Sequence, residues 1–335
     1  MKKLFQSAVR SLEKKEDLVL AVIIERKGST PRGEGAAMLV GADGRIGGTI
    51  GGGAIEYHAQ RMAEKLIEEK HCAVEHFYLK PNEVQDLGMV CGGDVTVAFC
   101  YLKADMYSIT LLEEALRLYE KDEEFWMILD TGSKENIKIS FYSKMDGIKG
   151  SVVPSEVKEY LKDKPVLTDI QGETYFTWKL KNLSRVYIFG GGHVSQALVP
   201  VLAAVDFKCT VLEDREEFGR KELFPDAEDV KLIDIRNIAA AVQIAAHDFV
   251  CIMTRGHKDD LEVQAQVLKT EACYIGVIGS RRKKAAVFSK LKERGFTDAD
   301  LDRVITPIGL DIGAETPAEI AVSIAAEMIK KRSEM

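Results

Sequence analysis

A glycine-rich turn between an apolar segment and a helical segment is the part of this sequence that most directly suggests chemistry. Residues 185–189 are typical of a buried strand, and Gly190, Gly191, Gly192 and His193 lead into the helix. Glycines allow a tight turn and let a phosphate approach the backbone, and the free N–H groups at a helix start favour negative charge. The pattern predicts a Rossmann-type nucleotide-binding turn.

Two acidic residues stand where such a turn expects a carboxylate for a ribose hydroxyl. Glu213 and Asp214 end the next apolar segment, about twenty residues beyond the glycines. Ser195, a small residue, occupies the third glycine position of the fingerprint. The alternative is a Rossmann scaffold that keeps its glycines for packing and binds no nucleotide.

A second polar loop follows a later predicted strand, at residues 248–253. It offers a cation, an imidazole and acids in Arg255, His257 and Asp260. In open parallel sheets, ligands bind beyond the carboxyl ends of the strands. We therefore expect these residues at the same sheet edge as the glycine turn.

A third loop follows the predicted strand at residues 273–278. Ser280, Arg281 and Arg282 precede two lysines at the expected start of a helix. Cations there oppose the helix dipole, so their position favours an anionic partner such as a phosphate. A solvated basic helix start is the alternative.

The N-terminal half has its own glycine loop directly before a helical segment. Gly51, Gly52 and Gly53 precede residues 54–69, and Arg32 and Arg45 come from neighbouring loops. Successive backbone amides at such a place form an anion-binding nest. No Gly-Lys-Ser/Thr follows, so the loop is not a P-loop. A turn in which the chain packs closely against another backbone is the alternative.

Cys91 is the cysteine most suited to chemistry, because glycines follow it in a segment that is not strongly apolar. An accessible thiol acts as a nucleophile or as a soft metal ligand. An inert thiol is the alternative for a single cysteine. Four other cysteines lie in apolar runs and are expected in the core: Cys100, Cys209, Cys251 and Cys273.

The elements that would position these residues divide the chain near residue 180. Residues 1–180 combine helical and strand patterns and predict a mixed α/β domain, with only one strand, at 174–179, expected between 143 and 184. Residues 181–335 alternate six apolar strands with helical segments, which predicts a Rossmann-type parallel sheet.

Composition limits the classes of function. Acidic residues outnumber basic ones by 53 to 46, which gives a net charge of −7 and disfavours a nucleic-acid partner. No apolar run reaches the ~20 residues that span a bilayer, and no signal peptide is expected, so the sequence predicts a cytoplasmic protein without a membrane partner. A homodimer is expected because it is the commonest assembly.

Several segments together resemble the xanthine dehydrogenase accessory factor (XdhC/CoxI) family. They occur in the expected order at both ends of the chain: GSTPR (28–32), GTIGGGAIE (48–56), GMVCGG (88–93), GHV (192–194), TRGHKDD (254–260), YIGVIGSRRK (274–283) and PIGLDIG (307–313). The family often has Gly-Ala-Gly-His where this chain has three glycines before His193. Residues from about 103 to 180 carry no recognised motif of the family.

The resemblance implies a function that spacing alone does not. It implies a chaperone that binds the molybdenum cofactor (molybdopterin) and assists exchange of an oxo ligand on molybdenum for sulfide, with a cysteine desulfurase as donor. It also implies insertion of the cofactor into a xanthine dehydrogenase-type apoenzyme, as part of purine catabolism. The family's glycine-flanked cysteine falls on Cys91, which the resemblance makes a cofactor and metal ligand.

An NAD(P)-dependent oxidoreductase that uses the Rossmann turn is the alternative from another class. Tyr175 and Lys179 fit a Y-x-x-x-K pattern, but they fall in a predicted strand, where they would not pair as on a helix face. His257 is the remaining candidate acid. The sequence therefore favours a cofactor chaperone over a catalyst.

Overall fold

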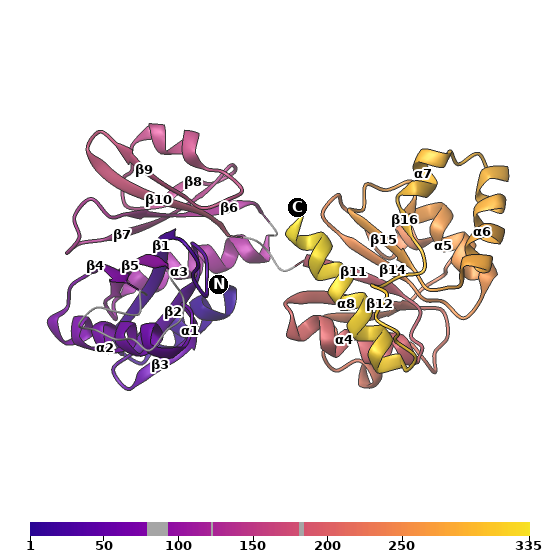
Figure 1. The fold of residues 1–335 in the computed structure, drawn as a ribbon, viewed down its shortest axis with the longest axis horizontal. Helices are drawn as coiled ribbons and strands as arrows, with labels where there is room; N and C mark the ends of the chain where they lie inside the picture. The colour runs from indigo at the N-terminus through magenta and orange to yellow at the C-terminus, as the bar shows by residue number, and fades with distance from the viewer. Residues whose placement is uncertain (79–92, 122, 181–183) are drawn as a thin grey trace. The chain divides into compact units, whose positions relative to one another are not determined.

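The computed structural model describes residues 1–78, 93–121, 123–180 and 184–335. The chain divides into two compact units, Met1–Asn182 and Leu183–Met335 (Figure 1). The first unit contains two antiparallel sheets with helices, and the second contains one parallel sheet. The fold is therefore a mixed α/β unit followed by a Rossmann-type unit, as the sequence predicted.

The first sheet of the N-terminal unit is built on a strand that is apolar on both faces. Its strand order is β3-β2-β1-β5-β4. The strands are β1 (Leu18–Lys27), β2 (Ala37–Gly41), β3 (Gly44–Gly48), β4 (Ala73–Tyr78) and β5 (Asp94–Leu102). Alternate residues of β1 enter different clusters, Leu18, Leu20 and Val22 on one face and Val19 and Ala21 on the other. Because apolar side chains of β1 point alternately to the two faces of the sheet, both faces must be packed against other elements.

The second sheet of the unit has the order β8-β7-β6-β10-β9. Its strands are β6 (Phe125–Asp130), β7 (Lys138–Ser143), β8 (Gly147–Gly150), β9 (Val166–Ile170) and β10 (Glu173–Leu180), with a short 3₁₀ helix η1 (Ser155–Tyr160) before β9. The expectation of a single strand after residue 143 was wrong, since β8 and β9 also form there. Both are short and largely solvent-accessible, so neither has a strong apolar pattern.

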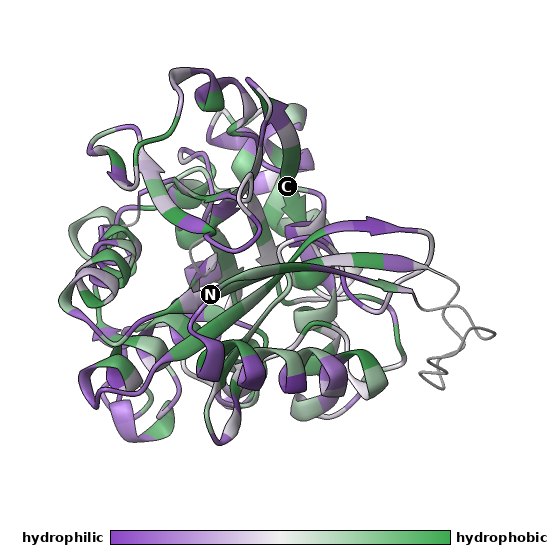
Figure 2. Cartoon of the chain, turned by 90° about the vertical axis from the view of Figure 1, so that its left-hand side faces the viewer, coloured by the Kyte–Doolittle hydropathy of each residue, from purple (hydrophilic) through white to green (hydrophobic). Residues whose placement is uncertain are grey.

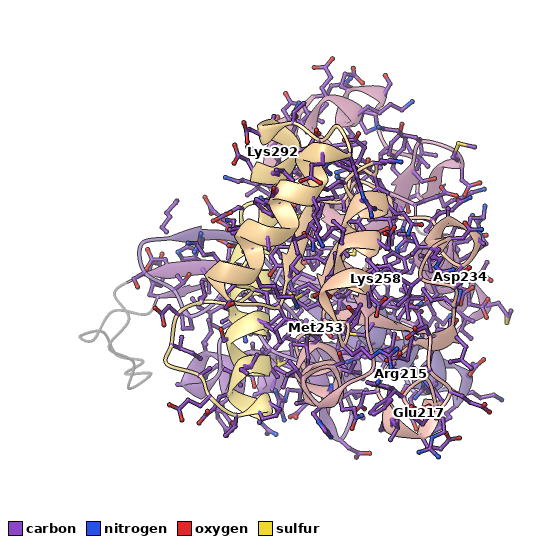
Figure 3. All side chains as sticks on the ribbon, turned by 90° about the vertical axis from the view of Figure 1, so that its right-hand side faces the viewer. Arg215, Glu217, Asp234, Met253, Lys258 and Lys292 are labelled. Carbon is purple, nitrogen blue, oxygen red and sulfur yellow. The ribbon has the colours of Figure 1, made fainter. Side chains whose placement is uncertain are left out.

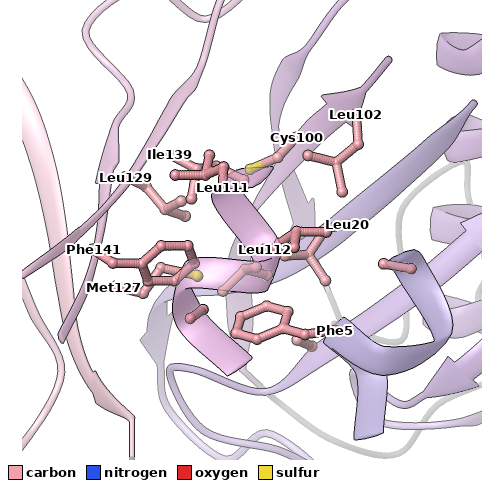
Figure 4. Close-up of a cluster of buried hydrophobic side chains, with 14 of the residues drawn as sticks. Phe5, Leu20, Cys100, Leu102, Leu111, Leu112, Met127, Leu129, Ile139 and Phe141 are labelled. Atoms are coloured by element: carbon pink, nitrogen blue, oxygen red, sulfur yellow. The ribbon is translucent and has the colours of Figure 1, made fainter. Parts of the chain in front are cut away.

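Helices supply the cover that the first sheet requires. Helices α1 (Lys2–Glu13) and α3 (Met106–Glu120) contribute Phe5 and Leu112 to a cluster that also takes residues from both sheets, such as Leu20 and Phe141 (Figure 4). Helix α2 (Gly53–Glu69) packs on the opposite face of the first sheet. Figure 2 shows hydrophobic residues concentrated along the central strands of this unit.

The C-terminal unit has six parallel strands in the order β13-β12-β11-β14-β15-β16. They are β11 (Ser184–Phe189), β12 (Phe207–Glu213), β13 (Asp229–Leu232), β14 (Phe249–Ile252), β15 (Tyr274–Val277) and β16 (Val304–Ile305). In sequence order this is the 3-2-1-4-5-6 arrangement of the Rossmann fold. Successive strands are added to one side of β11 up to β13 and to its other side from β14 onward, and such folds bind ligands at this switch point between β11 and β14.

Five α-helices are described in this unit. They are α4 (His193–Ala204), α5 (His257–Val267), α6 (Arg281–Glu293), α7 (Asp298–Asp302) and α8 (Pro317–Ser333). Helix α8 begins with a capping box, in which the Thr316 hydroxyl accepts from the Glu319 amide and the Glu319 carboxylate accepts from the Thr316 amide.

Two of the helical crossovers expected between strands are replaced by short 3₁₀ helices, η2 (Lys221–Leu223) and η3 (Ile238–Ala240). The start of η3 is held by a side chain from α5. The Gln266 side chain accepts from the Ile238 amide and donates to the Ile235 carbonyl, so it satisfies backbone groups that the short helix leaves without a partner.

No helix in the described part of the chain is long and apolar enough to cross a membrane.

Candidate functional site

The glycine turn of the C-terminal unit is packed tightly against the loop that follows β14. Gly190 has a φ of 109°, and a Cβ at this position would lie 2.3 Å from the Met253 carbonyl oxygen. The Met253 amide donates to Phe189 O at 2.8 Å. Only glycine fits here. Because it has no side chain, the turn after β11 and the loop after β14 can come into contact. Figure 3 labels Met253, Arg215 and Lys258 in this part of the unit.

The helix start beyond the turn remains open to a ligand. A Cβ on Gly192 would have no heavy atom within 4 Å, and α4 has neither a side-chain cap nor an acidic residue in its first turn. His193, its first residue, is exposed. Ser195 is buried and donates to Gly190 O at 2.6 Å, so it holds the turn in shape. No side chain therefore caps the backbone N–H groups at the start of α4, which can donate to a ligand.

Glu213 does not stand open as the sequence predicted for a ribose-binding acid. It is 2% exposed, and both of its oxygens are bound by the chain itself. Oε2 accepts from the Gly191 amide at 2.7 Å and from the Arg215 guanidinium at 2.9 Å. Oε1 accepts from the Asp214 and Arg215 amides and from Arg215 Nε, at 3.0 to 3.1 Å. An internal carboxylate thus takes one of the glycine amides that a phosphate would use.

The electrostatics of this carboxylate follow from its partners. Burial alone would raise the pKa of Glu213, but hydrogen bonds from Arg215, Asp214 and Gly191 outweigh it and lower the pKa to about 2. Asp214, which is exposed, has its pKa raised, first by a hydrogen bond with Glu213 and then by burial. Arg215 also lies over the Phe218 ring, 4.1 Å from its centroid. Sequence reasoning did not include Arg215, although a cation two residues after Glu213 is a visible signal.

The loops after β14 and β15 are joined by a buried polar cluster. Asp260 is fully buried, accepts from the Thr254 hydroxyl at 2.5 Å and forms an ion pair with Lys283. Thr254 lies in the first loop, Asp260 in α5 and Lys283 in α6. The contact therefore fixes the starts of these two helices next to each other.

Two lysines of the expected basic loop make contacts within the unit. Lys283 is used by Asp260, and Lys284 lies over the Phe288 ring at 5.0 Å from its centroid. Ser280 caps α6 by accepting from the Lys283 amide, and Arg255 is exposed.

His257, Arg281 and Arg282 lie within described helices, but their side chains are outside what the structure describes. The backbone alone places His257 at the first position of α5 and Arg281 and Arg282 at the first two positions of α6.

In the N-terminal unit the structure brings the glycine-containing loops together. A Cβ on Gly51 would lie 3.2 Å from the Pro31 side chain, and a Cβ on Gly93 would lie 2.6 Å from Ser29 O. Gly93 is thus in close backbone contact with the 28–35 loop, in which Arg32 is exposed. Loops far apart in the sequence therefore meet at one place in this unit.

The second glycine loop is also capped by an internal carboxylate. Glu56 accepts from the Gly52 amide at 3.2 Å and from the Thr49 hydroxyl, and its other oxygen is paired with Arg45 at 3.0 Å. A Cβ on Gly52 or on Gly53 would meet no atom within 4 Å. The arrangement of a glycine amide, a glutamate and an arginine repeats that of Gly191, Glu213 and Arg215.

Cys91 lies outside the described residues, so its predicted role as a ligand stays a prediction. The cysteines that are described are mostly buried. Burial raises the pKa of Cys209 to about 12 and that of Cys273 to about 11, and it also raises the pKa of Cys72, Cys100 and Cys251. Neutral buried thiols are poor nucleophiles. Within the described ranges, no cluster of histidine, cysteine and acidic residues is arranged to hold a metal ion.

The Y-x-x-x-K pattern lies on a strand, as predicted. Tyr175 and Lys179 both belong to β10 in the N-terminal unit. Lys179 is paired with Glu124 at 2.6 Å and with Asp163 at 2.7 Å. The pattern therefore gives no support to a dehydrogenase site.

Two family models match this chain. The model described as the XdhC and CoxI family matches residues 11–78, and the XdhC Rossmann domain matches residues 186–328. Together these ranges include the glycine loops of both units, except for the segment around Cys91.

Three curated relatives match almost the whole chain. The uncharacterized protein YqeB of Escherichia coli K12 is 25% identical over 98% of this chain, which spans only 46% of that relative's length. A probable xanthine dehydrogenase subunit of Bacillus subtilis 168 is 26% identical, with 96% of this chain and 95% of the relative covered. The molybdenum cofactor insertion chaperone PaoD of E. coli K12 is 21% identical, with 97% and 86% covered.

A solved structure is similar over the same extent. The crystal structure of a xanthine dehydrogenase from Bacillus halodurans superposes with a TM-score of 0.82 at 26% identity, covering 98% of this chain and 96% of that one.

Proposed function

The chain belongs to the XdhC and CoxI family, and from this premise we propose that it is an accessory protein that binds the molybdenum cofactor for a molybdenum hydroxylase. The relationship to a molybdenum cofactor insertion chaperone over 97% of the chain is the observation that carries the proposal. The similarity to a probable xanthine dehydrogenase subunit supports a hydroxylase of that type as the recipient.

The proposed cargo carries an anionic phosphate on a pterin, and the glycine loops suit such a group. Open space lies beside Gly52, Gly53 and Gly192, so a ligand can approach the backbone there. Of the predicted cofactor-binding residues, His193 and Arg255 are exposed and available for contact. We also propose that Cys91 is a thiolate ligand of molybdenum, as the resemblance to the family implies, and its substitution tests this role separately.

Glu56 in the N-terminal unit and Glu213 in the C-terminal unit each give the glycine loop of their own unit a physical means of releasing an anion. Each carboxylate occupies a glycine amide and is neutralised by an arginine. An anionic cargo that uses these amides must compete with the internal carboxylate. The net gain on binding is therefore smaller than the gross contact energy, as suits a carrier that must hand its cargo on.

We further propose that the chain assists replacement of an oxo ligand on molybdenum by sulfide, with a cysteine desulfurase as the donor, before insertion into a xanthine dehydrogenase-type apoenzyme. A cytoplasmic location and a homodimer belong to the same proposal. An NAD(P) role for the Rossmann turn has less support, because both oxygens of Glu213 are already bound. Titration with NAD(H) and NADP(H) is expected to give no binding.

The test is activation of a hydroxylase in cells that lack this chain. We expect the hydroxylase to accumulate without sulfurated cofactor, and the parent chain to restore its activity. The variant Cys91→Ala is expected to fail while remaining folded. Cys273→Ala serves as the matched control, because that partly buried thiol donates to the Asp248 carbonyl and its pKa is raised to about 11, so it is a poor nucleophile. Full hydroxylase activity in the deletion strain would remove the basis for the proposal.

A further inference from the structure

A polar hollow in the N-terminal unit is lined by residues that belong to none of the glycine loops and to no motif of the family. Its volume is about 680 Å³, within the ~300–1,000 Å³ range of small-molecule sites. Polar side chains line most of it: Asp130, Ser133, Asn136, Lys138, Ser155, Glu156, Gln171, Glu173 and Tyr175. Val152, Val153 and Pro154 supply the apolar part.

The sheet itself arranges three of these residues in a row. Lys138 on β7 is directly opposite Asp130 on β6, and Asp130 is directly opposite Tyr175 on β10. Directly opposed residues share a sheet face. Glu173, two residues before Tyr175 on β10, lies on the same face. The paired strands β7, β6 and β10 therefore place a cation, two carboxylates and a phenol on the sheet face that lines the hollow.

The hydroxyl of Tyr175 has no partner in the described part of the chain. The residue is 4% exposed, and its ring packs with Ile128, Val153 and Val157. Burial, and then the charges of Asp130 and Glu173, raise the pKa of Tyr175, so the phenol is protonated at neutral pH. A buried phenol normally finds a hydrogen-bond partner, and here its O–H lines the hollow instead.

The charge of the hollow is negative. Asp130, Glu156 and Glu173 face a single cation, Lys138. Glu156 is held by Gln171 at 2.9 Å, and its pKa is lowered, first by a backbone hydrogen bond and then by Ser155 and Gln171. No ion pair joins Asp130 or Glu173 to a cation among the described residues. Three carboxylates in one hollow repel one another unless a cation neutralises them.

We propose that this hollow binds a small metabolite that carries an ammonium or guanidinium group together with an oxygen acceptor. The cation is held by Asp130 and Glu173, and the oxygen accepts from the hydroxyl of Tyr175 and lies toward Lys138. The inference is independent of the molybdenum cofactor proposal, because none of these residues belongs to the glycine loops.

Isothermal titration of the full chain with L-arginine tests the proposal. Arginine supplies both features, agmatine lacks the carboxylate, and glutarate carries two carboxylates and no cation. We expect binding of arginine, weaker binding of agmatine and none of glutarate. Glu173→Gln is expected to weaken arginine binding about tenfold, as for loss of one charge-assisted hydrogen bond.

Matched variants separate a specific site from general charge. Tyr175→Phe keeps the ring in its apolar cluster and is expected to weaken arginine binding while leaving agmatine binding unchanged. Glu159→Gln removes an exposed acid of η1 that does not line the hollow and is expected to change nothing. The proposal is overturned if the parent chain gives no heat with millimolar arginine, or if Glu159→Gln and Glu173→Gln lower the affinity equally.

Discussion

The internal carboxylate Glu213 gives a prediction that depends on the geometry of the glycine turn. The variant Glu213→Gln keeps the size of the side chain and removes its charge. A neutral amide cannot serve both the Gly191 amide and the Arg215 guanidinium as the carboxylate does. Arg215, whose side chain is 20% exposed, is then left beside Asp214 alone, at 3.8 Å.

The magnitude follows from the pKa of Glu213. A pKa of about 2 in place of the ordinary 4.5 corresponds to about 3 kcal/mol of stability, at about 1.4 kcal/mol for each pKa unit. The raised pKa of Asp214 acts in the opposite direction and offsets part of this gain. We therefore expect Glu213→Gln to lower the free energy of unfolding by about 2 kcal/mol at neutral pH.

The pH dependence has a definite sign. Because the pKa of Glu213 is lower in the folded chain, its contribution is present above about pH 4.5 and is lost as the pH falls toward 2. Urea unfolding of the parent and the variant should therefore differ at pH 7 and converge in acid. Glu216→Gln, an exposed neighbour, is the matched control and should stay within about 0.5 kcal/mol of the parent. An unfolding free energy of Glu213→Gln equal to that of the control at pH 7 would refute the reasoning.

Three further substitutions test other contacts. Asp260→Asn leaves Lys283 without its buried partner and should lower the free energy of unfolding by about 3–5 kcal/mol in urea titration, and a loss below about 1 kcal/mol would contradict the pairing. Gly190→Ala places a Cβ 2.3 Å from a backbone carbonyl oxygen and should lower Tm strongly, whereas Gly192→Ala, where space is open, should change Tm little. Thr316→Ala removes the cap of α8 and should cost about 1 kcal/mol in chemical unfolding, and no change would mean that the capping box is dispensable.

The Rossmann unit could be predicted because its signals are local. Most of its strands are short apolar runs, and the residues that form the glycine turn and the capping box of α8 are neighbours in the sequence. The strands β8 and β9 could not be predicted, since they are short and owe their place to pairing with β7 and β10. The helical segment expected between β13 and β14 is reduced to the short 3₁₀ helix η3, and a contact that the local sequence does not reveal, from Gln266 to the Ile238 amide and the Ile235 carbonyl, holds its start.

The candidate site was predictable in its loops but not in its pairings. The sequence identified Glu213 and the residues of the basic loop, yet it offered Glu213 as an open acceptor. The structure shows that Arg215 and the Gly191 amide already occupy it. Likewise, the pairing of Lys283 with Asp260 joins two helices and leaves no trace in local spacing.

The most direct test of the proposed function is the composition of the chain purified from cells that make the molybdenum cofactor. We predict that molybdenum and the pterin co-purify with the chain in equal amounts, measured by metal analysis and by mass spectrometry of the released pterin. Cys91→Ala should carry less of both, and Cys273→Ala should match the parent. A parent chain that carries neither molybdenum nor pterin, from cells whose hydroxylases are loaded, would contradict the account.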